Sequence, residues 1–152
     1  MKLQKDLREF IELLNSHGVE YLVVGGHAVA FHGYPRYTGD IDFPVRPTQE
    51  NASQIVSAIE RFGLSDAESL KSTLVQQEKI VQIGRPPNRI DILTSASGID
   101  FEATWERAIS GSLDGLPVRF PDLVSLLKNK RASARAKDLA DVEELEKVAK
   151  PG

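Results

Sequence analysis

The chain contains no cysteine, one methionine and one tryptophan among its 152 residues. The lack of cysteine excludes a disulfide framework, a thiol nucleophile and Cys-based zinc or iron–sulfur sites. The sequence has no apolar run approaching the ~18 residues of a membrane-spanning helix. Its first residues lack the apolar core and small-residue cleavage site of a signal peptide. We therefore expect a cytoplasmic protein that does not enter a membrane.

The net charge argues against some classes of partner, but it does not identify a function. A formal net charge of −3 argues against binding nucleic acid through bulk charge alone, although a local basic patch could still do so. Hydrophobic residues make up 41% and charged residues 27%, which is typical of an ordinary globular protein. A chain of this length is expected to form a single domain, residues 1–152.

Hydrophobic periodicity predicts a mixed order of helices and strands. Strand-like segments occur at 21–24, 40–45, 79–83 and 89–93, and an Asp-Gly turn at 114–115 predicts a hairpin. The segments 79–83 and 89–93 are expected to pair antiparallel through a loop at 84–88. Helical spacing covers 4–17, 28–32, 49–62, 100–108, 121–131 and 137–148. The expected fold class is α/β (α+β): a mixed β-sheet flanked by helices, with a core at about 20–120 and C-terminal helices at about 121–149.

Three aspartates flanked by apolar residues lie on two of the predicted strands. Asp40 and Asp42, at i and i+2, point to the same face about 6.7 Å apart, while Ile41 faces the core. Asp91 repeats this pattern on another strand. Like charges held this close repel unless a cation lies between them, and magnesium prefers carboxylate oxygen. The pattern thus favours a divalent-metal site, although acidic-apolar-acidic triplets also occur on half-exposed strands without metal.

A glycine pair precedes the acidic strand. Gly25 and Gly26 end one predicted strand and open a short helix, which lets backbone N–H groups approach a phosphate. The spacing matches neither the dinucleotide fingerprint nor a phosphate-binding loop with its lysine. A tight turn requiring positive φ explains the pair equally well.

Five cations and no acid occupy residues 128–137: Lys128, Lys130, Arg131, Arg135 and Lys137. This segment could neutralise a triphosphate or approach an RNA backbone. The alternative is a solvated helix end whose charges Asp138 and Asp141 complement. Arg36 is a further phosphate-binding candidate, because its loop immediately precedes Asp40.

Taken in order, these segments resemble a known superfamily. The run from Tyr21 to Arg36, the Asp40–Asp42 motif, Arg89–Ser95, Asn129–Ser133 and Lys137–Asp141 are similar to small bacterial members of the DNA polymerase β-like nucleotidyltransferase superfamily. They lie near the abortive-infection toxin group. The likeness spans roughly residues 20–145. Two departures are His27, where serine is common, and Ala134–Lys137, which lacks a Gly-Arg-Pro-Lys form.

The resemblance implies a nucleotidyltransferase-like fold and a role for each motif. Asp40 and Asp42 would bind Mg²⁺, with Mn²⁺ as the alternative ion, and Asp91 would complete the metal site or act as general base. The residues expected to bind the nucleotide are Gly25, Gly26, Arg36, Lys130, Lys137 and Asp138.

The implied activity is a magnesium-dependent transfer of a nucleoside monophosphate from an NTP to an acceptor hydroxyl. RNA such as tRNA, protein and a small molecule are the acceptor classes. A toxin acting on tRNA, with an antitoxin as partner, is a narrower version of this activity. A non-catalytic nucleotide-binding relative and a purely structural interaction domain are the alternatives.

Overall fold

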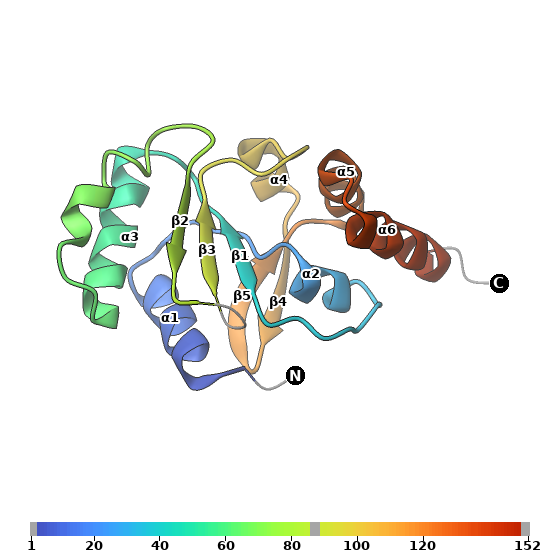
Figure 1. Ribbon diagram of the computed structural model, residues 1–152, viewed down its shortest axis with the longest axis horizontal. Coiled ribbons are helices and arrows are strands. Elements are labelled where there is room, and N and C mark those ends of the chain that lie inside the picture. Colours follow the sequence, from blue (N-terminus) through green and yellow to red (C-terminus); the bar gives the residue numbers. More distant parts are fainter. Residues whose placement is uncertain (1–2, 86–88, 150–152) are drawn as a thin grey trace.

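Two small sheets and two groups of helices make up the computed structural model, which describes residues 3–85 and 89–149. In Figure 1 a three-stranded sheet lies between helices α1 (Lys5–Ser16) and α3 (Gln49–Phe62) on one side and α5 (Leu123–Ser133) and α6 (Ala136–Ala149) on the other. The shorter helical elements are α2 (Gly26–Phe31), the 3₁₀ turn η1 (Ala67–Leu70) and α4 (Phe101–Glu106). The strands are β1 (Ile41–Pro44), β2 (Ile80–Ile83), β3 (Ile90–Leu93), β4 (Ile109–Leu113) and β5 (Leu116–Phe120). The α+β fold class is therefore confirmed.

The central sheet has the order β1-β3-β2. Strands β1 and β3 run parallel, a pairing that the sequence patterns did not predict. Strand β2 pairs antiparallel with β3, as predicted. The loop predicted between them includes residues 86–88, which lie outside the described residues. Strands β4 and β5 form the predicted hairpin around Asp114 and Gly115.

Residues 21–24 do not form a regular strand, contrary to the prediction. The segment lies between β1 and β5 and bonds to each in turn: the Leu22 N–H donates to the Pro44 carbonyl at 2.9 Å, and the Val23 N–H donates to the Arg119 carbonyl at 2.9 Å. Only isolated bridges result, at Tyr21 and Val24. The apolar run is nevertheless buried, and it joins the hairpin to the central sheet.

Period-2 alternation separates the two faces of the central sheet. Ile41 and Phe43 of β1 face the apolar core, where the Phe43 ring lies 6.1 Å from that of Phe10 on α1. Side chains one position away, such as Asp42, face the opposite side. That opposite face carries the carboxylates, toward α5 and α6.

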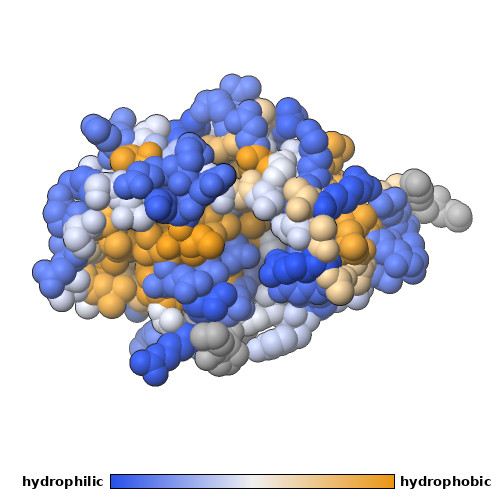
Figure 2. All heavy atoms as spheres, turned by 45° about the horizontal axis from the view of Figure 1, so that its top comes forward, coloured by the Kyte–Doolittle hydropathy of each residue, from blue (hydrophilic) through white to orange (hydrophobic). Residues whose placement is uncertain are grey.

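The surface shows the usual mixture for a globular chain. Figure 2 shows apolar side chains gathered in the middle of one face, with hydrophilic side chains around them. None of the helices in the described ranges is long and apolar enough to cross a membrane.

Candidate functional site

The parallel register places two of the predicted metal ligands side by side. Asp42 of β1 and Asp91 of β3 are direct partners across neighbouring strands, about 4.8 Å apart in such a sheet. Asp40 immediately precedes β1. We call Asp40, Asp42, Asp91 and Arg89 the strand cluster.

Arg89 neutralises one side of the strand cluster. Its Nε donates to Asp91 Oδ1 at 2.9 Å and its Nη2 donates to Asp91 Oδ2 at 3.2 Å, which is a bidentate fork. The same guanidinium lies 3.9 Å from Asp40 Oδ2, and the Arg89 backbone N–H donates to Asp40 Oδ1 at 3.1 Å. The pairing with Asp91 raises the pKa of Arg89 above its ordinary value, so this cation is permanent.

Asp42 has no such partner within the described residues. Burial raises the pKa of Asp42 above its ordinary value, and the charge of Asp91 adds to the effect. The positive charges of Lys137 and Arg135 act in the opposite direction without reversing the shift. A cation placed at Asp42 would therefore relieve an uncompensated carboxylate.

The glycine pair fits closely around these carboxylates. Gly25 has a φ of +78°, and a Cβ added there would lie 3.3 Å from Asp42 Oδ2. A Cβ on Gly26 would lie 2.6 Å from Thr38 Cβ. The Thr38 hydroxyl in turn donates to the Asp40 carbonyl at 3.1 Å. Both glycines thus allow the start of α2 to approach the strand cluster closely.

Asp42 and Gly25 line a hollow of about 200 Å³ that reaches α5 and α6. Its far wall includes Lys130, Arg135 and Asp138. The structure therefore brings Asp42 of the strand cluster and Gly25 of the glycine pair to the same hollow as Lys130 and Asp138 of the predicted C-terminal motifs.

Lys130, however, is engaged by neighbouring acids rather than free for phosphate. Its ammonium lies 3.2 Å from Asp138 Oδ1 and 3.1 Å from Asp141 Oδ2, and its side chain is 4% exposed. Arg36 forms two hydrogen bonds of 2.9 Å with Asp141, and Arg135 donates to Asp138 at 2.7 Å. We call these five residues, Arg36, Lys130, Arg135, Asp138 and Asp141, the helix cluster.

The cations of the helix cluster compensate its acids. Burial by itself would raise the pKa of Asp138, but hydrogen bonds from Arg135 and Lys130 outweigh it and hold the pKa below its ordinary value. The pKa of Asp141 is lowered in the same way, against burial, by Arg36 and Lys130. The nucleotide-binding roles of Arg36, Lys130 and Asp138 stay predictions, and Lys137 is exposed on α6.

His27 was not among the predicted site residues. It lies in the first turn of α2, is 3% exposed, and its Nε2 has no hydrogen-bond partner within the described residues. Burial lowers the pKa of His27, and the nearby charge of Arg36 adds to this, so the ring is neutral at pH 7. The one sequence signal for His27 was a polar residue directly after the glycine pair.

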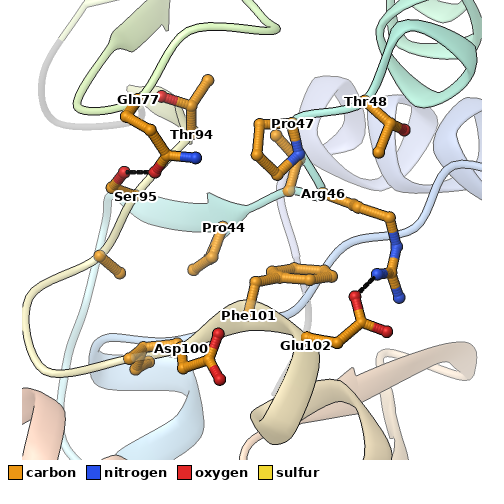
Figure 3. A pocket seen from close by; sticks show the side chains of 13 residues that line it. Pro44, Arg46, Pro47, Thr48, Gln77, Thr94, Ser95, Asp100, Phe101 and Glu102 are labelled. Carbon is orange, nitrogen blue, oxygen red and sulfur yellow. Dashed lines mark hydrogen bonds and ion pairs between the residues drawn. The ribbon is translucent and has the colours of Figure 1, made fainter.

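A second hollow, of about 290 Å³, adjoins the first, since Ser95 and Ala96 line both. Figure 3 shows the Phe101 ring on one side of it and the Ser95 hydroxyl bonded to Gln77 on the other. The Arg46 guanidinium is paired with Glu102 and lies 5.2 Å from the centre of the Phe101 ring. No sequence motif pointed to this hollow, because its lining comes from separate stretches of the chain, at residues 44–48, 77, 94–96 and 99–102.

The residues present fit one divalent ion at Asp42 and Asp40. Their donor atoms are carboxylate oxygens, and Asp42 lacks a counter-charge within the described residues. In the part of the chain that the structure describes, no three His, Cys, Asp or Glu side chains converge closely enough to hold a metal ion together. Comparisons with protein-family models and with curated proteins gave no match.

Proposed function

We propose that the protein is a magnesium-dependent nucleotidyltransferase that moves a nucleoside monophosphate from an NTP to an acceptor hydroxyl. The observation that carries the proposal is the direct pairing of Asp42 with Asp91 beside the Gly25 turn. A sheet face with paired carboxylates next to a close backbone turn is suited to triphosphate and metal together. The resemblance of the motifs to the polymerase β-like superfamily supports the same activity.

Asp40 and Asp42 would hold the ion, and Mn²⁺ could replace Mg²⁺. The bound ion would supply charge neutralisation between the carboxylates and the triphosphate. Gly25 and Gly26, which let the backbone pack closely against Asp42 and Thr38, would present the start of α2 to the phosphate oxygens. Lys137, an exposed cation whose charge acts to lower the pKa of Asp42, is the candidate to approach those oxygens.

Asp91 would accept the proton of the acceptor hydroxyl. The acceptor oxygen bonds to the α-phosphorus, the bond from that phosphorus to the pyrophosphate oxygen breaks, and pyrophosphate leaves with the electron pair. The hollow in Figure 3, which shares Ser95 and Ala96 with the hollow that Asp42 lines, is the candidate space for an acceptor group. RNA, protein and small molecules are the acceptor classes to be tested.

The test is label transfer from each α-labelled NTP, with Mg²⁺, to total cellular RNA, to protein and to small-molecule extract. Asp42→Asn is expected to lower transfer by about 100-fold or more, since it removes a ligand of the catalytic ion. Asp66→Asn, an equal change at an exposed carboxylate, is the matched control and should leave transfer unchanged. Transfer that survives Asp42→Asn would overturn the proposed role of the strand cluster.

The non-catalytic alternative makes a different prediction. Calorimetry would then show NTP binding that Asp42→Asn weakens, with no labelled product under any condition. The toxin version predicts growth arrest on expression of the wild-type chain but not of Asp42→Asn. Harmless expression of the wild-type chain would contradict it.

A further inference from the structure

Arg89 occupies the position between Asp91 and Asp40 that a second cation would otherwise take. Its fork binds both oxygens of Asp91, whose side chain is 11% exposed, and the same guanidinium reaches Asp40. Arg89 and Asp91 are two residues apart on one strand, so they share a face of the sheet. Asp91 lies on β3 and Arg89 immediately precedes that strand, so the local backbone fixes the pair.

A guanidinium fork and a metal ion compete for the same carboxylate. An Arg–carboxylate fork is a strong, geometrically specific pair. A divalent ion that bridged Asp91 to Asp42 would have to displace that fork from oxygens that are already satisfied. Asp42, by contrast, makes no ion pair in the described ranges 3–85 and 89–149, and Asp40 meets the Arg89 guanidinium at 3.9 Å, against 2.9 Å for Asp91. A metal at Asp42 and Asp40 would therefore break one long contact and leave the fork on Asp91 in place.

We infer that Arg89 replaces the second ion of a two-metal site, so that the protein binds one divalent ion, at Asp42 and Asp40, and keeps Asp91 for the acceptor proton. Each carboxylate oxygen has two acceptor positions, so the fork leaves Asp91 able to meet a hydroxyl. The inference rests on the proposed function, because it assigns a role to Arg89 within the same site. It makes Arg89 a positioning residue for Asp91 rather than a group that touches the ion.

The experiment counts Mn²⁺ ions bound to the full chain by electron paramagnetic resonance at saturating Mn²⁺. The wild-type chain is expected to bind about one ion, and Arg89→Gln about two, because loss of the guanidinium opens the Asp91–Asp42 pair to a second ion. Arg89→Lys keeps the charge and should remain at about one. Arg61→Gln, which removes a positive charge from an exposed position at the end of α3, is the matched control and should also remain at about one.

A double substitution separates the role of Arg89 from a general change in charge. Asp91→Asn alone should leave the count at one, whereas adding it to Arg89→Gln should return the count from two to one. Thermal unfolding without metal checks that each variant folds. If Arg89→Gln does not fold, Arg89→Met at the same position provides the count.

The outcomes distinguish the two proposals. A wild-type count of two, or an unchanged count in Arg89→Gln, would overturn the inference and leave the proposed function standing. Absence of bound Mn²⁺ in every variant would overturn the metal site of the proposed function and the inference with it. A count that rises equally in Arg61→Gln would show a general charge effect and would also overturn the inference.

Discussion

The strand cluster and the helix cluster are built from the same residue types but are balanced differently. In the helix cluster each aspartate faces two cations, and the pKa values of Asp138 and Asp141 are both lowered. In the strand cluster one arginine serves Asp91 and Asp40, while the pKa of Asp42 is raised. The acids of the helix cluster are therefore compensated by the cations that they hold in place, whereas Asp42 has no paired cation within the described residues.

The helix cluster also explains how three distant segments are held together. Arg36 precedes β1, Lys130 lies on α5 and Asp141 on α6, and Asp141 forms ion pairs of 2.9 Å with Arg36 and 3.1 Å with Lys130. Because breaking a buried pair leaves an uncompensated charge, these contacts define one relative position of the helices. The loop that leads to Asp40 is anchored by the same contacts.

Lys130→Met is the change with the largest expected effect on stability. It leaves Asp138 and Asp141 buried next to one another with one cation fewer, and we expect a loss of about 3–5 kcal/mol in the free energy of unfolding. Urea unfolding at pH 7 measures it. Lys147→Met, which removes an exposed lysine from the same region, should change stability by about 0.5 kcal/mol or less. Equal effects of the two changes would mean that the helix cluster does not hold α5 and α6.

The same substitution in the two clusters should have opposite consequences. Asp141→Asn leaves Arg36 and Lys130 short of a partner, and we expect a loss of about 1–3 kcal/mol. Asp42→Asn removes a half-buried carboxylate that its neighbours repel and leaves no cation unpaired, so stability without metal should stay the same or rise slightly. Urea unfolding in the presence of a chelator compares them, with Asp66→Asn as control. A loss for Asp42→Asn as large as that for Asp141→Asn would contradict the difference between the clusters.

Local patterns predicted most of the fold and which candidate site residues share a face of the sheet. Alternation of apolar residues identified β1, β2 and β3, and it placed Asp40 and Asp42 on one face. The Asp-Gly pair predicted the hairpin. Residues 21–24 failed as a strand because their bonding partners come from β1 and the hairpin, which local sequence does not reveal.

The charge partners could be predicted only where they are close in sequence. Arg36 and Asp141 are 105 positions apart, and nothing in either segment indicates that they pair. The burial of Lys130 depends on how α5 and α6 pack. The sequence of residues 128–137 therefore does not distinguish a lysine that faces a phosphate from one that pairs with acids inside the protein. Arg89 and Asp91, two positions apart on a predicted strand, did carry a signal, since alternation places them on one face.

Acid titration provides the finest test of the comparison, because the two clusters should depend on pH with opposite sign. Asp138 and Asp141 have folded-state pKa values below that of the unfolded chain, about 3.9, so their contribution is present above this pH and is lost as the pH falls through the folded values. The pKa of Asp42 is raised, so its contribution is fully present below about pH 3.9 and is lost as the pH rises through the folded value. We would measure unfolding free energies with a chelator from about pH 7 down to about pH 3. As the pH falls, the stability difference between wild type and Asp141→Asn should shrink. Over the same range the stability of wild type relative to Asp42→Asn should increase. Parallel curves for the two variants would show that both aspartates are equally compensated, and the distinction between the clusters would then be lost.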